Sequence, residues 1–159
     1  MNKIYLSLGS NIGDRAQNIA RALDALPGQA IRVVKKSSLY ETEPVELRAQ
    51  DWFLNCVVEI ETDLQPQDLM QALLTIERSM GRERLIPKGP RIIDMDILLY
   101  GSVTVKEPQL EIPHPRMAGR RFVLEPFAEI APDAEHPVLK KTIQQLLEDT
   151  PDHSEVRRA

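Results

Sequence analysis

The sequence predicts an α+β fold in which helices cover an antiparallel sheet. Several segments carry an apolar residue at every second position, which is the period of a strand, and the segments between them carry one every three or four positions, which is the period of a helix. The 159 residues are 42% hydrophobic and show no internal repeat. This size and composition suit one domain over 1–159 with its own core.

The first part of the chain alternates strand and helix patterns. Residues 3–9 (KIYLSLG) alternate apolar and polar side chains and predict a strand. Asp14 can then cap a helix that runs to about residue 26, where a Pro-Gly pair ends it. The β-branched residues of 31–40 predict a second strand, and the polar, aperiodic segment 43–52 predicts a long loop of the kind that is often functional.

The pattern then repeats in the middle of the chain. Residues 53–61 predict a third strand whose apolar row is Leu54, Cys56, Val58 and Ile60, with Phe53, Asn55, Val57 and Glu59 on the opposite face. Pro66 suits the first turn of a helix over 66–80. A basic, irregular segment at 82–91 leads into a fourth strand at 93–99.

The remaining residues form an extension of this core. We expect short extended pieces near 103–105 and 109–112, a short helix near 120–125, a helix near 142–148 and a loose polar tail after Pro151. The resulting order, βαββαβ plus a C-terminal extension, suits a ferredoxin-like sandwich with two helices on one face of an antiparallel sheet. A fold of this kind does not by itself define an activity.

Composition excludes several classes of protein. The net charge is −4 and no basic run exceeds a pair, which argues against a nucleic-acid-binding protein. No segment is apolar enough to span a membrane, and the N-terminus lacks the apolar region of a secretory leader. Cys56 is the single cysteine and fits a buried strand position rather than a nucleophile. We therefore expect a cytoplasmic protein, acting as a monomer, that binds neither nucleic acid nor membrane.

Asp94 and Asp96 are the strongest local signal of chemistry. They stand two apart in a predicted strand, so their carboxylates lie side by side on one face. Two carboxylates this close favour a cation, and Mg²⁺ commonly binds one or two carboxylates together with substrate phosphates. Arg82, Arg84 and Arg91 precede the pair and could neutralise a polyphosphate. A solvated strand face beside a solvated basic loop is the alternative interpretation.

Two further groups could contact a ligand. Phe53 and Asn55 share a strand face beside the long loop, where an aromatic ring and an amide could stack on a flat heterocycle and bind its edge. His114 stands between two prolines, followed by Arg120 and Phe122. The structural alternatives are a strand face packed beneath the loop and a rigid turn that happens to contain a histidine.

Several segments together resemble the 6-hydroxymethyl-7,8-dihydropterin pyrophosphokinase family. They are LSLGSNIGD (6–14), SSLYETEP (37–44), FLNCVVEIET (53–62), IERSMGRER (76–84), GPRIIDMDILLYG (89–101) and IPHPRMAGRRFVLEPFAEIAP (112–132), in the order of the family. The resemblance implies a ferredoxin-like enzyme of folate biosynthesis. Such an enzyme transfers pyrophosphate from ATP to the hydroxymethyl group of 6-hydroxymethyl-7,8-dihydropterin and releases AMP.

The resemblance also implies a role for individual residues. Asp94 and Asp96 would hold two Mg²⁺ ions on the ATP phosphates and, with Arg82 and Arg91, form the catalytic set. ATP would contact Glu77, Arg82, Arg84, Arg91, Ile97, His114 and Arg120. Phe53 and Phe122 would enclose the pterin ring, whose edge would be bound by Asn55 and by groups at Thr42 and Val45. The magnesium field, assisted by Asp96, would help the hydroxymethyl group lose its proton.

Some positions depart from the family pattern. Lys88 replaces a tryptophan found in some members, in a segment that is one residue shorter, and Met95 replaces the usual leucine. Two other functions remain open from the residues themselves. One is a different Mg-nucleotide transferase, which would not need a hydroxymethylpterin to release AMP. The other is a non-catalytic ferredoxin-like binding module, which would not bind nucleotide in a Mg²⁺-dependent way.

Overall fold

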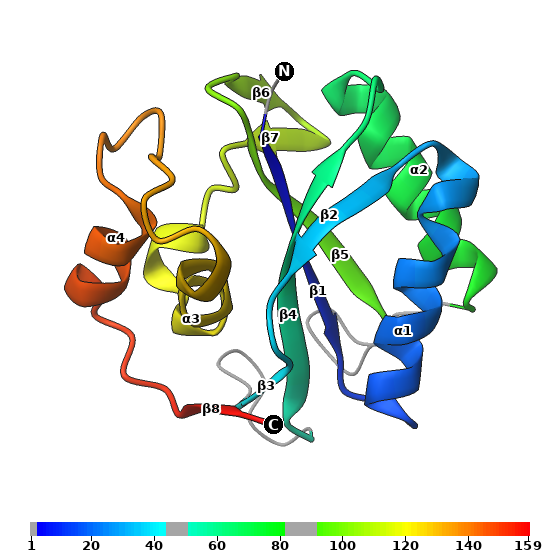
Figure 1. The fold of residues 1–159 in the computed structure, drawn as a ribbon, viewed down its shortest axis with the longest axis horizontal. Helices are drawn as coiled ribbons and strands as arrows, with labels where there is room; N and C mark the ends of the chain where they lie inside the picture. Colours follow the sequence, from blue (N-terminus) through cyan, green and yellow to red (C-terminus); the bar gives the residue numbers. More distant parts are fainter. Residues whose placement is uncertain (1–2, 44–50, 82–91) are drawn as a thin grey trace.

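The computed structural model describes residues 3–43, 51–81 and 92–159, and its central element is a six-stranded antiparallel sheet. The strand order is β5-β1-β4-β3-β8, and β2 also pairs with β4. Helices α1 and α2 cover one face of the sheet, and α3 and α4 lie on the other (Figure 1). The predicted α+β class is confirmed, and the C-terminal extension adds a layer of helices on the second face.

The βαββαβ core is present in the predicted order. It consists of β1 (Ile4–Ser10), α1 (Arg15–Ala25), β2 (Arg32–Lys36), β4 (Phe53–Glu61), α2 (Pro66–Ser79) and β5 (Asp94–Tyr100). Strands β1 and β2 are both antiparallel to β4, and β4 and β5 are both antiparallel to β1. Each helix therefore joins two parallel strands that are separated by an antiparallel one, which is the split βαβ arrangement.

Local sequence explains where the two core helices begin. The side chain of Asp14 accepts a hydrogen bond from the Gln17 amide at 3.1 Å and caps α1, as predicted. Pro66 occupies the first turn of α2, where an absent N–H is tolerated. The apolar stripes of both helices pack on the alternating apolar rows of the strands, including Leu6, Cys56 and Ile97. Burial raises the pKa of the Cys56 thiol to about 12, as expected for an inert core cysteine.

The second predicted strand is divided. Residues 31–40 form β2 and the separate strand β3 (Tyr40–Thr42), and both pair with β4. Buried Ser37 lies at the break, where its hydroxyl accepts from the Val57 amide at 3.0 Å and replaces a ladder hydrogen bond. The break lets the chain bend toward the C-terminal part of the protein.

The C-terminal extension contributes to both faces of the sheet: Leu110 and Ile112 join the first core, and the later helices form a second core on the other face. It contains the hairpin β6 (Val105–Glu107) and β7 (Leu110–Ile112), a 3₁₀ turn at Met117–Gly119, α3 (Arg121–Ile130) and α4 (Ile143–Asp149). Tyr5 packs on Phe127 with ring centroids 4.7 Å apart. Helix α3 is longer than the predicted 120–125, because it continues through Pro126. A bulge between Ile97 and Leu99 also moves Leu99 into this second core rather than the first.

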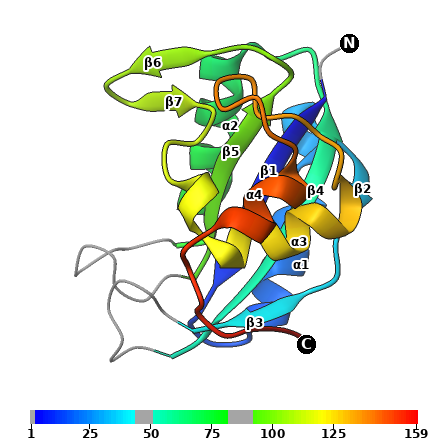
Figure 2. The ribbon, with the colours of Figure 1, turned by 90° about the vertical axis from the view of Figure 1, so that its left-hand side faces the viewer.

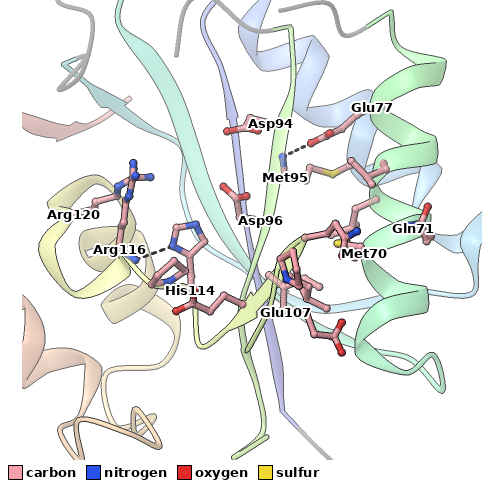
Figure 3. Close-up of a pocket in the computed structure, with 18 residues that line it drawn as sticks. Met70, Gln71, Glu77, Asp94, Met95, Asp96, Glu107, His114, Arg116 and Arg120 are labelled. Atoms are coloured by element: carbon pink, nitrogen blue, oxygen red, sulfur yellow. Dashed lines mark hydrogen bonds between the residues drawn. The ribbon is translucent and has the colours of Figure 1, made fainter. Parts of the chain in front are cut away.

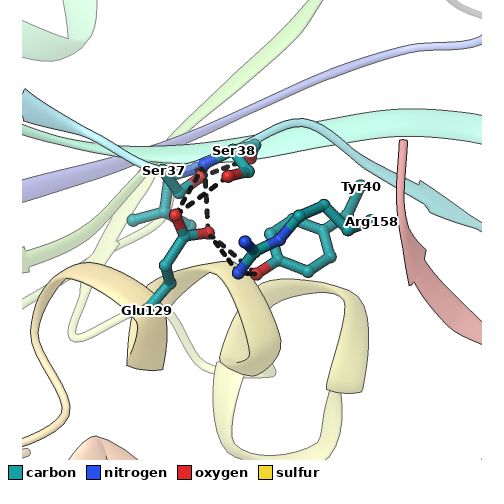
Figure 4. A network of polar contacts seen from close by, with 6 residues as sticks. Ser37, Ser38, Tyr40, Glu129 and Arg158 are labelled. Atoms are coloured by element: carbon teal, nitrogen blue, oxygen red, sulfur yellow. Dashed lines mark hydrogen bonds and ion pairs between the residues drawn. The ribbon is translucent and has the colours of Figure 1, made fainter.

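The polar tail is ordered, contrary to the prediction. Residues Val156–Arg158 form β8, which pairs with β3. Glu129 of α3 joins the two segments, because its carboxylate accepts from Ser38 and from the Tyr40 hydroxyl at 2.8 Å and lies 3.7 Å from Arg158 (Figure 4). Charge complementarity thus holds a strand that carries no apolar pattern.

None of the helices in the described part of the chain is long and apolar enough to cross a membrane. The longest, α2, has 14 residues.

Candidate active site

Most predicted site residues of β3, β4 and β5 lie on one face of the sheet. Gly9 of β1 pairs with Asp94 of β5 on one side and with Asn55 of β4 on the other, and Asn55 in turn pairs with Tyr40 of β3. Paired residues share a face, and residues two apart share it too, so Asp96 and Phe53 belong to the same face. This is the face covered by α3.

The acidic pair lies on the wall of a cavity of about 620 Å³ at the outer strand of the sheet. Figure 3 shows Asp94 and Asp96 on β5, with α2 on one side and the 114–120 segment on the other. The described residues contain no cluster of three or more metal-ligating His, Cys, Asp or Glu side chains. Two carboxylates are nevertheless a sufficient protein contribution to a Mg²⁺ site when phosphates supply other ligands.

Glu77 holds the backbone between the two aspartates. Its side chain is 3% exposed, and its Oε2 accepts a hydrogen bond from the Met95 amide at 2.7 Å (Figure 3). In a strand, the amide of Met95 points in the plane of the sheet, away from β1, while the flanking side chains point to the α3 face. The carboxylate of Glu77 therefore fixes the segment that presents Asp94 and Asp96.

His114 is a neutral donor rather than a cation. Its amide donates to the Leu98 carbonyl at 3.0 Å. Its Nδ1 accepts from the Arg116 amide at 3.2 Å (Figure 3). Burial lowers the pKa of the ring to about 4, and the positive charges of Arg120 and Arg116 act in the same direction. The negative charge of Asp94 acts in the opposite direction but does not outweigh them. Since Nδ1 is an acceptor, the neutral ring carries its proton on Nε2 and can donate from there.

The other predicted nucleotide residues also line the cavity. Glu77, Ile97, His114 and Arg120 all belong to its wall. The side chain of Ile97 is in the core, so its contribution to the cavity would come from the backbone of the outer strand. Sequence reasoning assigned no role to five other polar side chains of this wall, because isolated polar residues carry no pattern. They are Gln71, Glu107, Gln109, Glu111 and Arg116.

Phe53, Asn55 and Thr42 form a second group two strands away. Asn55 and Thr42 are buried, and the Asn55 Nδ2 donates to the Thr42 hydroxyl at 2.6 Å. The spacing of neighbouring strands, about 4.8 Å, places Asn55 roughly 10 Å from the strand that carries Asp94. Phe122 stands at the start of α3, and the Arg120 guanidinium lies 5.5 Å from the centroid of its ring.

Asp51 and Trp52, which directly precede β4, are hydrogen-bonded to side chains that follow β1. The Asn11 amide donates to the Asp51 carbonyl at 3.1 Å, and Arg15 donates to the Trp52 carbonyl at 3.0 Å. Asn11, which follows β1, therefore anchors the residues that lead into β4. Predicted site residues Val45, Arg82, Arg84 and Arg91, as well as Lys88, lie outside the described residues.

The fold and the site together define a class of protein. A ferredoxin-like sheet that presents two adjacent carboxylates beside a cavity with basic and neutral donors has the groups that binding of a Mg-nucleotide requires. Residues 5–132 match the model of the 7,8-dihydro-6-hydroxymethylpterin-pyrophosphokinase (HPPK) family, and the chain belongs to this family. The resemblance found in the sequence is thereby confirmed.

Curated relatives fall into two groups by length. The chain is 48% identical over 136 residues to the 2-amino-4-hydroxy-6-hydroxymethyldihydropteridine pyrophosphokinase of Methylorubrum extorquens, which covers 84% of this chain and 85% of that protein. It is 47% identical to the Bacillus subtilis enzyme of the same name, over 85% of this chain and 82% of that protein. It is 41% identical to the folic acid synthesis protein fol1 of Pneumocystis carinii, over 94% of this chain but only 20% of that protein.

Solved structures support the fold alone. Wild-type HPPK-DHPS of Plasmodium falciparum has a TM-score of 0.74 at 18% identity, over 92% of this chain and 44% of that one. The chain thus spans about a fifth of the length of the first relatives and less than half of this solved structure.

Proposed function

We propose that this protein transfers the pyrophosphoryl group of ATP to the hydroxymethyl group of 6-hydroxymethyl-7,8-dihydropterin, releasing AMP, in folate biosynthesis. The observation that supports this most is the shared sheet face, which carries the Asp94–Asp96 pair and, two strands away, the Asn55 amide with Phe53. This arrangement would bring a phosphate-transfer centre next to a site for a flat heterocycle, as the proposed reaction requires. The family and the names of the bacterial relatives agree with this pairing.

On the nucleotide side, the described residues supply charge and donors. Asp94 and Asp96 fit Mg²⁺ by their chemistry and common face, and we propose that they hold two ions with the ATP phosphates. Bound there, magnesium would neutralise phosphate charge and favour loss of the hydroxymethyl proton. Arg120 and the Nε2–H of His114 face the same cavity and would bind phosphate or nucleoside oxygens. Arg82, Arg84 and Arg91 are proposed as further phosphate contacts.

On the pterin side, the chain supplies stacking and hydrogen bonds. Phe53 and Phe122 would pack on the two ring faces, and the Asn55 carboxamide, with groups at Thr42 and Val45, would bind the ring edge. In the reaction, the hydroxymethyl oxygen attacks the β-phosphorus in line, the bond from that phosphorus to the α-phosphate oxygen breaks, and AMP leaves. The hydroxyl proton passes to solvent water with assistance from Asp96, so the main tasks of the protein are positioning and charge neutralisation.

An AMP-release assay with matched variants tests this function. We expect purified protein with Mg-ATP to release AMP only when 6-hydroxymethyl-7,8-dihydropterin is added. Asp96→Asn should lower this rate by roughly a hundredfold or more, because it removes a carboxylate from the metal site. Asp24→Asn, on the exposed side of α1, should leave the rate unchanged. Pterin-independent AMP release would favour another nucleotide transferase, and absence of Mg²⁺-dependent nucleotide binding would favour a binding module.

A further inference from the structure

Gly9 occupies the position in the sheet between the two halves of the site. It lies on β1, opposite Asn55 of β4 and opposite Asp94 of β5. Glycine in the middle of a strand lowers stability relative to other residues and often marks a place where other atoms approach the backbone closely. The backbone of Gly9 has no left-handed conformation that would itself require glycine. The reason for glycine at this position must therefore be space.

The space above Gly9 is occupied by the Asn55 side chain. A Cβ atom built on Gly9 would lie 2.4 Å from Asn55 Oδ1 and 3.5 Å from its Cγ, and 3.6 Å from Cδ1 of Phe53. The first of these separations is far below a van der Waals contact, whereas the distance to Phe53 is an ordinary one. An added Cβ at this position would therefore displace the side-chain amide of Asn55 and would leave the ring of Phe53 in place.

Asn55 cannot move without losing a buried hydrogen bond. Its Nδ2 is held by the Thr42 hydroxyl at 2.6 Å, and Asn55 and Thr42 are 7% and 1% exposed. The Thr42 hydroxyl thus holds the nitrogen end of the Asn55 carboxamide, and the gap at Gly9 leaves room for its oxygen end. A fixed carboxamide presents an acceptor and a donor in one plane, which is what recognition of the edge of a heterocycle requires.

We propose that Gly9 is a positioning residue for pterin recognition: its missing side chain lets the Asn55 amide lie against β1 in the orientation that binds the ring. This inference rests on the proposed function and assigns a role to a residue that has no side chain in the metal site or the nucleotide cavity, although its backbone pairs with that of Asp94. Substitution of Gly9 should affect binding of one ligand only. Filling the gap disturbs Asn55, so pterin affinity should fall while nucleotide affinity does not.

The test compares Gly9→Ala with Gly28→Ala, which makes the same chemical change where nothing lies within 4 Å of the added atom. Calorimetry would measure binding of a non-hydrolysable Mg-ATP analogue and then of 6-hydroxymethylpterin to the nucleotide-bound protein. We expect Gly9→Ala to weaken pterin binding by roughly tenfold or more, as for a lost buried hydrogen bond with its unpaired partner. Nucleotide affinity should stay within about twofold, and Gly28→Ala should match wild type in both.

Two further variants separate this role from general damage to the sheet. Thr42→Val leaves the gap open but frees the Asn55 amide, so it should reproduce the selective loss even if Gly9→Ala fails to fold. In an Asn55→Ala background, Gly9→Ala should produce no additional loss, because the atom that it displaces is gone.

Each outcome is decisive. If wild type binds no pterin, the proposed function fails and this inference fails with it. If wild type binds pterin and a folded Gly9→Ala does not weaken it selectively, this inference alone is overturned. If Gly9→Ala does not fold, unchanged pterin binding by Thr42→Val overturns it instead. An equal loss with and without the Asn55 side chain would overturn it as well.

Discussion

The buried contact between Glu77 and the Met95 amide makes a quantitative prediction. Replacing Glu77 with alanine leaves a buried N–H of the outer strand without its 2.7 Å acceptor. An unpaired buried donor costs about 1–3 kcal/mol. The lost side chain also leaves a small cavity in a region that is 3% exposed. We therefore expect the free energy of unfolding to fall by about 2–4 kcal/mol.

The same variant should affect the metal site. Met95 lies between Asp94 and Asp96, so a backbone that is no longer fixed presents the two carboxylates less well. At saturating ATP, we expect the Mg²⁺ concentration for half-maximal AMP release to rise about three- to tenfold, corresponding to about 0.7–1.4 kcal/mol. Glu77→Gln keeps an acceptor oxygen and should show smaller changes in both measurements.

Urea unfolding and a Mg²⁺ titration of the transfer rate measure the two effects. Thr75→Ala, an exposed change on the same helix, is the matched control and should stay within about 0.5 kcal/mol of wild type. If Glu77→Ala unfolds like wild type and shows the same Mg²⁺ requirement, then Glu77 does not hold the segment that carries the acidic pair.

Three other predictions concern the ring site, the C-terminal strand and His114. Phe122→Ala should weaken pterin binding by roughly tenfold, through lost stacking and burial, and ATP binding less; equal affinities in calorimetry would remove Phe122 from the site. Burial acts to raise the pKa of Glu129, but hydrogen bonds from Tyr40 and Ser38 and the charge of Arg158 lower it overall. Glu129 therefore stabilises the fold at pH values above its pKa in the unfolded chain. In urea titrations, the difference in free energy of unfolding between wild type and Glu129→Gln should be largest at pH 7 and should disappear as the pH falls below about 4. A difference that does not depend on pH would contradict this. The pKa of His114 in the folded protein is lowered to about 4, so the unfolded chain binds a proton on this imidazole at higher pH than the folded chain does. The free energy of unfolding should therefore decrease as the pH falls from about 6.5 to 4. An NMR titration midpoint near 6.5 for His114 in the folded protein would refute this.

The elements that sequence could predict are those with a strong apolar period on a single face. Strand β4 has the predicted bounds, and α2 ends one residue before the predicted end, because each buries one regular row of side chains. The division of 31–40 into β2 and β3 depends on a hydroxyl that substitutes for a ladder bond, and the pairing of β8 depends on charges contributed by α3. Neither leaves a periodic signal in the sequence.

The candidate site divides in the same way. Strand alternation alone predicts that Asp94 and Asp96 lie side by side, and that Phe53 and Asn55 share a face. That both pairs occupy the same face of one sheet follows only from the register, in which Gly9 lies between Asp94 and Asn55. The hydrogen bond from the Met95 amide to Glu77 and the space above Gly9 depend on three-dimensional packing, so a one-dimensional pattern could not identify them.

The fate of the three ATP phosphates tests the central claim most directly. Wild-type protein would be incubated with Mg-ATP and 6-hydroxymethyl-7,8-dihydropterin, and the products followed by ³¹P NMR and mass spectrometry. We predict equimolar AMP and a pterin that carries two phosphates, with neither product formed when the pterin is omitted. Formation of ADP with a singly phosphorylated pterin, or of AMP without a phosphorylated pterin, would contradict pyrophosphoryl transfer.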